Sequence, residues 1–466
     1  MLATAEGGPL TKKQSKAKME ALERLERDYS IVRYLEPYDL AIVLKDDLHG
    51  VVALDGRVVL PLEYYYLEYQ SSAGLFVLSK ESEEGVGFAD RQRKQVLPYG
   101  FSGELLGLGV DFFHDGMTCL PRDGKYGIMD TAGRVVVPYV YDTPLSVCPA
   151  GKGLMLAHDY DRSTTCLLRF DGDTVIGPVY DIQTVYADDN LRQGKAMLQV
   201  SRIGGDGRDT LLGLYDTEGR EVVPCRYRSI SQFIGGKAVV ERKGAGCGLL
   251  DFGGRETVPC SPDRYPGEPS FLLESGLIVT YRDNQCGVVD PQGRQVIPFH
   301  DGYYYADTRE RIALLDNDYR LSVYDVGGRL LERYDAISDI EESVTGFPVH
   351  KEGGKWGFLD ERLHLLLPTR YNQIRQMDRS HYLVELDDGQ NAVVDPTGRV
   401  LLQGPYETVY HICDGIFEVY SCYNTDGDRE ALPYLKGLVD VHGNTTFSAE
   451  EMKRMEEWYR KNNNIK

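Results

Sequence analysis

The residues best able to do chemistry are spread thinly along this sequence. None of the nine histidines belongs to an HExxH motif or lies near a cysteine pair at zinc-binding spacing. The nine cysteines are an odd number and include no CxxC pair. We therefore expect ordinary surface or packing histidines and reduced thiols. We predict no catalytic, cofactor-binding or metal-binding residue.

Two short segments imitate ligand-binding loops. Gly244–Gly248 is rich in glycine like a phosphate loop, but it lacks the Lys-Ser/Thr ending and leads into a predicted strand rather than a helix. Residues 424–430 alternate oxygen-bearing side chains that could attract calcium. A calcium-binding EF-hand loop needs glycine at its sixth position and glutamate at its twelfth, where this segment has Arg429 and Leu435. We interpret 424–430 as a polar hairpin tip.

Two runs of tyrosine are the best candidates for a binding surface. They are Tyr64–Tyr66 and Tyr303–Tyr305. Consecutive residues of a strand point to opposite faces, so the three rings of one run cannot all be buried on one side. Either both faces pack against neighbouring segments, or the outward rings stack on sugars or anchor a protein partner.

Charge limits the classes of partner. The chain has 466 residues and a formal net charge of −20, from 72 acidic and 52 basic residues. Such a surface repels phosphate backbones and anionic lipids, so we expect no nucleic-acid binding, whereas a basic protein partner would suit it. No apolar run approaches the ~18 residues that span a bilayer, and the first residues do not resemble a secretory signal. We expect a cytoplasmic protein.

One motif recurs throughout the sequence. Its strongest copies read Gly-apolar-apolar-Asp, then Gly-Arg, then Pro, and they begin at Gly127, Gly213, Gly248 and Gly287. Successive anchor aspartates are 35 to 45 residues apart. A period of this size indicates a tandem array. Weaker copies are centred on Asp55, Asp90, Asp171, Asp325, Asp360, Asp395 and Asp440.

Each copy can be interpreted as a β-hairpin. The residues before the aspartate are apolar and typical of a strand. Asp-x-x-Gly forms a turn, because the carboxylate accepts backbone hydrogen bonds and the glycine adopts positive φ. A return strand ends at the proline, which has no amide to donate. An earlier strand, such as Lys237–Glu241 or His381–Glu385, completes a unit of about three antiparallel strands.

Two further positions of the motif have packing consequences. The glycine before each aspartate lies inside a strand, so we expect a backbone or a ring to lie against it. The residue before that glycine varies, which indicates one packing position filled by different side chains: Tyr126, Cys247, Cys286 and Trp356. A tyrosine follows the proline in several copies and should pack between units: Tyr141, Tyr227, Tyr265 and Tyr371.

These strings resemble the WG-repeat (KWG-repeat) family, which is found mainly in bacterial proteins. The literal motif occurs once, at Lys355–Asp360, and Lys125-Tyr126-Gly127 is the closest variant. The resemblance covers roughly residues 35–447. It implies a β-repeat architecture and an interaction role, and it offers no catalytic residue to transfer.

The two ends differ from the repeats. Residues 1–30 are predicted to form a polar helix or tail, helical over Lys12–Arg27, which is either a solvated cap or a docking segment. Residues 31–447 form the array. Residues 448–466 begin with the capping box Ser448-x-x-Glu451 and are predicted to form a helix that covers the last unit, with partner binding as the alternative.

About eleven units exceed the four to eight blades of an ordinary propeller. We therefore predict an all-β fold in which the antiparallel units form an open, solenoid-like stack with short terminal helices. Two consecutive propeller-like rings are the alternative. The leading functional hypothesis is a non-catalytic scaffold that binds a protein or peptide. The alternatives are a glycan binder that uses the tyrosines and an enzyme of unknown class.

Overall fold

The computed structural model describes most of the chain. It covers residues 10–462 except 93, 103–112, 190–191, 204–209, 263–264, 266–269, 338–344, 352, 407 and 423–433. The polar segment 424–430 therefore lies outside the described residues. The predicted all-β array of antiparallel units with short terminal helices is confirmed, and the described sheets form eleven units.

The first four units lie between the N-terminus and residue 179. A short 3-10 helix, η1 (Glu36–Tyr38), separates the first two strands. The strands are β1 (Ser30–Leu35), β2 (Leu40–Lys45), β3 (Leu48–Ala53), β4 (Val58–Tyr64), β5 (Tyr66–Gln70), β6 (Leu75–Ser79), β7 (Val86–Ala89), β8 (Gln95–Phe101), β9 (Met117–Thr118), β10 (Tyr126–Asp130), β11 (Val135–Tyr141), β12 (Leu145–Val147), β13 (Leu154–Asp159), β14 (Thr164–Arg169) and β15 (Thr174–Val179).

The fifth to eighth units form two seven-stranded sheets, because a single long strand closes one unit and opens the next. The strands are β16 (Asp181–Asp188), β17 (Gln193–Ile203), β18 (Thr210–Tyr215), β19 (Glu221–Ile230), β20 (Lys237–Arg242), β21 (Gly246–Asp251), β22 (Glu256–Ser261), β23 (Phe271–Leu272), β24 (Ile278–Arg282), β25 (Gln285–Val289), β26 (Gln295–Asp307), β27 (Arg311–Asp316), β28 (Leu321–Asp325) and β29 (Leu330–Tyr334).

The last three units precede the C-terminal helix. Their strands are β30 (Ala336–Ile337), β31 (Phe347–Lys351), β32 (Lys355–Leu359), β33 (Leu365–Tyr371), β34 (Gln373–Gln376), β35 (Tyr382–Glu385), β36 (Asn391–Val394), β37 (Val400–Gly404), β38 (Thr408–Cys413), β39 (Ile416–Cys422) and β40 (Tyr434–Asp440).

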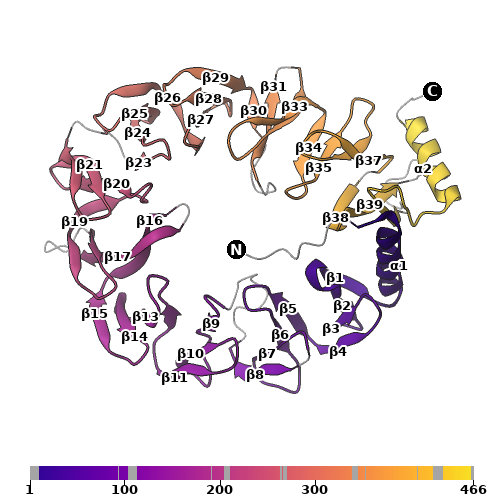
Figure 1. Ribbon diagram of the computed structural model, residues 1–466, viewed down its shortest axis with the longest axis horizontal. Helices are drawn as coiled ribbons and strands as arrows, with labels where there is room; N and C mark the ends of the chain where they lie inside the picture. The colour runs from indigo at the N-terminus through magenta and orange to yellow at the C-terminus, as the bar shows by residue number, and fades with distance from the viewer. Residues whose placement is uncertain are drawn as a thin grey trace.

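A complete unit has four antiparallel strands, one more than predicted. The additional strand is the first, which lies nearest the middle of the ring in Figure 1. It forms because the chain continues beyond the proline of one unit and pairs with the next. Strand β26 shows this directly: its first half pairs with β25 and its second half with β27. This strand lacks a motif of its own, so the repeat pattern did not reveal it.

The array closes into one ring, which corrects the expected open course and the alternative of two rings (Figure 1). The first unit meets the eleventh through α1 (Lys12–Asp28), which packs on β38–β40. One buried cluster at this seam combines Met19 and Leu22 of α1 with Cys413, Ile416 and Leu438. The closure gives the apolar faces of the two terminal units a partner.

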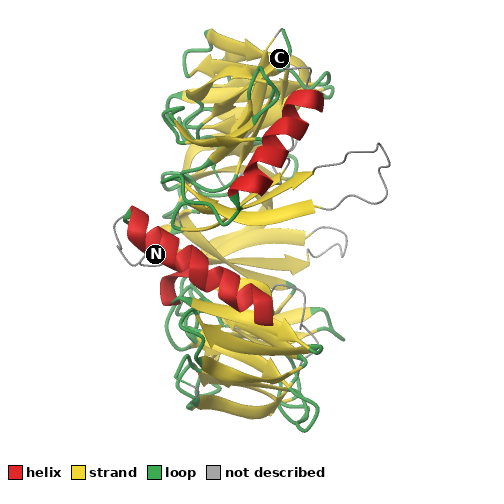
Figure 2. Cartoon of the chain, turned by 90° about the vertical axis from the view of Figure 1, so that its right-hand side faces the viewer, coloured by secondary structure: helices red, strands yellow, loops and turns green. Residues whose placement is uncertain are grey.

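Both helices lie on the outside of the ring, along the stretch of rim at the right of Figure 1, which faces the viewer in Figure 2. The α1 helix begins with a capping box between Thr11 and Gln14. It was predicted to be either a solvated cap or a docking segment, and its buried residues pack on the last unit at the seam. The α2 helix (Ala449–Asn462) has the predicted Ser448–Glu451 capping box and buries Met455 against the last unit.

The core is continuous from unit to unit. Residues of the first unit, such as Leu60 and Tyr64, share one buried cluster with Leu67 and Phe76 of the second. Each unit thus buries its apolar faces only against its neighbours, as in other repeat arrays. Within the described residues, neither helix is long and apolar enough to cross a membrane.

Candidate functional site

The anchor aspartates serve as turn caps, as predicted. Asp290 is typical: Oδ1 accepts backbone N–H bonds from Gln292 and Arg294, both at 2.9 Å, and Oδ2 accepts from Arg294 Nε at 2.7 Å. Burial acts to raise the pKa of Asp290, but these bonds outweigh it and the pKa is lowered. The carboxylates are occupied by their own turns, so they offer no set of ligands for a metal ion.

The motif glycines make close approaches. A Cβ on the strand residue Gly213 would lie 2.5 Å from the carbonyl oxygen of Val223, and one on Gly287 would lie 2.8 Å from the Phe299 ring. The prediction of a backbone or a ring at this position is therefore confirmed. The turn glycine Gly219 has φ of +82°, and its Cβ would lie 2.6 Å from the carbonyl oxygen of Val175 in the preceding unit.

The tyrosines that follow the prolines link adjacent units. Tyr227 is buried and its hydroxyl donates to Glu256 of the next unit at 2.7 Å. Tyr265 is also buried and its hydroxyl donates to the Pro291 carbonyl oxygen in the next anchor turn, again at 2.7 Å. The predicted packing between units is confirmed for these residues.

The two tyrosine runs divide between packing and surface. Tyr64 is buried, whereas Tyr65 is exposed. In the second run Tyr303 is exposed, Tyr305 packs edge-on against Phe347, and Tyr304 lines a pocket. Each run thus presents one partly exposed ring, Tyr65 at 52% and Tyr303 at 40% exposure.

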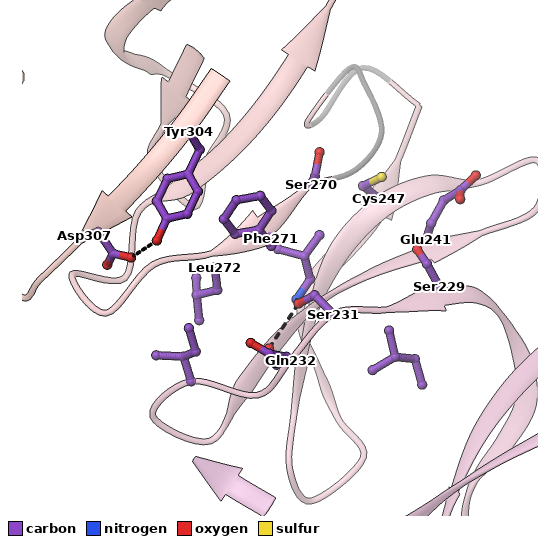
Figure 3. A pocket seen from close by; sticks show the side chains of 13 residues that line it. Ser229, Ser231, Gln232, Glu241, Cys247, Ser270, Phe271, Leu272, Tyr304 and Asp307 are labelled. Atoms are coloured by element: carbon purple, nitrogen blue, oxygen red, sulfur yellow. Dashed lines mark hydrogen bonds between the residues drawn. The ribbon is translucent and has the colours of Figure 1, made fainter. Parts of the chain in front are cut away.

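That pocket lies between the sixth and seventh units and has a volume of about 640 Å³ (Figure 3). Its apolar wall includes Ile230, Phe271 and Leu272, and Phe271 packs edge-on against the Tyr304 ring at 5.0 Å between centroids. Serine hydroxyls and the buried Cys247 thiol add polar atoms. The remaining described lining residues are Ser229, Ser231, Gln232, Ile234, Val239, Glu241, Ser270 and Asp307.

Two acidic side chains lie on opposite sides of this pocket (Figure 3). The Tyr304 hydroxyl donates to Asp307 Oδ1 at 2.7 Å, and the Glu274 backbone amide donates to Oδ2 at 2.8 Å. Both donors are neutral, and burial raises the pKa of Asp307. Glu241 pairs with Arg228 at 3.4 Å. No described residue that lines the pocket is basic.

A second cavity, of about 690 Å³, opens at the same junction. Ile234 and Leu272 line both cavities. At this gap between the units, the strand β23, which contributes Leu272 to both cavities, has only two residues. The sequence signal for this gap is the set of prolines Pro262, Pro266 and Pro269, which cannot donate to a ladder and which precede β23.

The cysteines at equivalent motif positions are packing residues. Cys247 and Cys286 are buried before the strand glycine, as the shared packing position predicts. The described cysteines form no disulfide with one another. Burial raises the pKa of the Cys286 thiol to about 11, which keeps it protonated and unreactive at neutral pH.

Comparison with known proteins identifies the repeat. The family model of the WG containing repeat matches residues 213–244, from the strand glycine of the fifth unit to the β20–β21 turn. The chain therefore contains a WG repeat. A search of curated proteins finds no match to it.

Solved structures similar to this chain share little sequence with it. A crystal structure of the eukaryotic initiation factor is 9% identical, with a TM-score of 0.33, over 70% of this chain and 93% of that one. BamB from Moraxella catarrhalis is 13% identical, with a TM-score of 0.28, over 59% and 90%. Kluyveromyces lactis Hsv2 is 10% identical, with a TM-score of 0.26, over 64% and 98%. None of these likenesses bears on function.

Proposed function

We propose that this WG-repeat protein is a non-catalytic scaffold that binds a basic segment of a partner protein. The pocket between the sixth and seventh units receives a lysine or arginine side chain of that segment. The observation that carries the proposal is the pocket's composition, since acidic and aromatic side chains line it and none of its described lining residues is basic.

The pocket chemistry suits a long cationic side chain. Asp307 has neutral hydrogen-bond donors, so its charge is available to a ligand cation. Phe271 and Tyr304 provide aromatic rings on which a cation can lie. Ile230 and Leu272 provide apolar surface for the methylene stem. The net charge of −20 would also speed the approach of a basic partner.

The same geometry argues against acid–base catalysis in the pocket. A pair of catalytic groups must reach the same reacting atoms. Here Asp307 and Glu241 lie on opposite sides (Figure 3), and Glu241 is engaged by Arg228. A binding site does not require its acidic groups to converge, because each carboxylate can contact a different part of the ligand.

Selection from a displayed peptide library tests the proposal. We expect enriched peptides to carry lysine or arginine beside apolar residues, and to bind Asp307→Asn/Glu241→Gln about tenfold more weakly than the native protein. The control is Asp318→Asn/Glu310→Gln, which removes the same charge from exposed positions outside the pocket. It should retain binding within about twofold.

Three outcomes would overturn the proposal. The first is that no basic peptide is enriched. The second is that the control variant loses as much affinity as the pocket variant, which would indicate a diffuse charge effect. The third is that peptides fail while a glycan array gives binding that is lost in Tyr65→Ser/Tyr303→Ser, since these rings are exposed. Thermal unfolding of each variant verifies that it is folded.

A further inference from the structure

A group of metal-ligating side chains lies between the tenth and eleventh units, apart from the pocket described above. Asp378 and His381 belong to the turn that joins β34 to β35, and His411 lies on β38. One ligand atom from each of the three residues lies within 4.8 Å of the other two. Thirty residues separate the two histidines in sequence, so their proximity is a product of the fold.

Both imidazoles direct the same nitrogen at one carboxylate oxygen. His381 Nδ1 lies 2.8 Å from Asp378 Oδ2, and His411 Nδ1 lies 2.8 Å from the same atom. The ring centroids of the two histidines are 4.7 Å apart. Two nitrogens and one oxygen thus converge on a common point from two different units.

The surrounding structure holds these side chains in place. The Ser380 backbone amide donates to Asp378 Oδ1 at 2.7 Å, and His381 Nδ1 also lies 3.0 Å from this oxygen. The Phe417 ring lies 5.3 Å from the centroid of each imidazole. Such support orients ligands before an ion arrives and lowers the entropic cost of binding.

The group remains accessible to solvent. The side chains of His381, His411 and Asp378 are 16%, 20% and 31% exposed. His411 also lines a cavity of about 720 Å³ at the ring seam, which provides a path for entry. Among the described atoms, His411 Nε2 is buried without a hydrogen-bond partner, so Nδ1 is the nitrogen that this ring presents to other polar groups.

We propose that Asp378, His381 and His411 bind a divalent transition-metal ion such as Zn²⁺, with water completing the coordination. Two imidazoles and one carboxylate form a ligand set that suits this ion. The ion would lie where the two Nδ1 atoms now approach the carboxylate oxygen, and it would bind the neutral imidazoles. Because His411 belongs to another unit than the other two ligands, the bound ion would cross-link the tenth and eleventh units.

The chain contains a matched control for this site. His364 Nδ1 lies 4.0 Å from Asp360 Oδ2, but Asp360 Oδ1 is occupied by the Arg362 and His364 amides of an anchor turn. Among the described residues, no third ligand joins this pair to form a metal-binding group. His364→Ala therefore removes an aspartate-paired imidazole without touching the proposed site.

The experiment is titration of the tag-free, chelator-treated full chain with Zn²⁺ by calorimetry, together with Co²⁺ absorption spectroscopy. We expect one saturable site, a visible Co²⁺ band, and an unfolding temperature that rises with Zn²⁺ concentration. His411→Ala and the more conservative Asp378→Asn should each weaken binding about tenfold or more. His364→Ala should bind like the native chain.

The proposal is overturned if the native chain shows no binding up to about 100 µM Zn²⁺. It is also overturned if His364→Ala weakens binding as much as His411→Ala, because the affinity would then belong to scattered surface histidines. If His411→Ala is unfolded, the Zn²⁺ affinity of Asp378→Asn tests the proposal instead, since that substitution keeps the side-chain volume. Circular dichroism of each metal-free variant establishes whether it is folded.

Discussion

At the scale of single residues, the glycines of the motif allow neighbouring segments of backbone to pack closely. Gly213 lies inside β18, where any side chain would meet the backbone around Pro224 on the bulged return strand. Gly219 is needed for a second reason, because it adopts positive φ and also lies against Val175 of the preceding unit. The motif therefore specifies a local turn and, through the same residues, the contact between neighbouring units.

Gly213→Ala should destabilise the protein by about 3 kcal/mol, because its Cβ would lie 2.5 Å from the Val223 carbonyl oxygen. The measurement is urea denaturation followed by circular dichroism. Gly177→Ala is the control: Gly177 also lies in a strand, but a Cβ there would meet nothing within 4 Å. That variant should be neutral or more stable by about 0.5 kcal/mol. Equal effects at the two positions would contradict this account of the motif.

The most informative single element is α1. Although its composition is polar, this helix has a narrow buried face formed by Ser15, Met19, Leu22 and Leu25, with Ala21 beside it. Lys18 reaches Asp39 of the first unit at 2.9 Å and Asp414 of the last unit at 2.6 Å. Desolvation acts to lower the pKa of Lys18, but these carboxylates outweigh it and the pKa is raised. The helix therefore joins the first unit to the last.

Met19→Ala/Leu22→Ala should destabilise the ring by at least about 2–5 kcal/mol, the range for one such truncation in a core. Both side chains are almost fully buried at the seam. Hydrogen exchange should show faster exchange in β1 and β38–β40 than in the native protein. The control is Lys16→Ala/Glu20→Ala on the exposed face, which keeps the net charge. Unchanged protection at the seam would show that α1 does not close the ring.

Closure is the property that belongs to the molecule as a whole. The Ser15 hydroxyl donates to Asp440 Oδ2 at 2.6 Å across 425 residues of sequence, and the bond is buried. Lys436 contacts Glu26 at 3.0 Å, also across the seam. Through these contacts the first unit packs against the last, whereas an open stack would leave each of the two terminal units with only one neighbour.

Zero-length carbodiimide cross-linking tests closure in solution. We expect cross-linked peptides that join Lys18 to Asp414 and Lys436 to Glu26 within one chain, because these pairs are in ion-pair contact. Mass spectrometry of the monomer fraction identifies them. Lys351 and Glu332, which pair at 3.0 Å within the array, provide the internal positive control. Recovery of the control link without the seam links would indicate an open array.

The unit could be predicted from sequence, whereas the candidate sites could not. Asp-x-x-Gly, the strand glycine and the proline act through local backbone geometry, so the hairpin and its glycine contacts follow from residue types a few positions apart. The pocket, in contrast, depends on how neighbouring units pack around the short strand β23. In the sequence, nothing connects His381 with His411, because neither histidine belongs to a local motif.

The amino-acid sequence by itself thus determined the repeated β-hairpin, its period, the terminal helices and the resemblance to the WG repeat. Only the tertiary structure decided that the units have a fourth strand, that the array closes into one ring, and which polar side chains meet. The physical reason is the separation in sequence of the residues that make each contact. A turn is specified by neighbours along the chain, whereas closure depends on contacts such as that of Ser15 with Asp440, which join residues 425 positions apart.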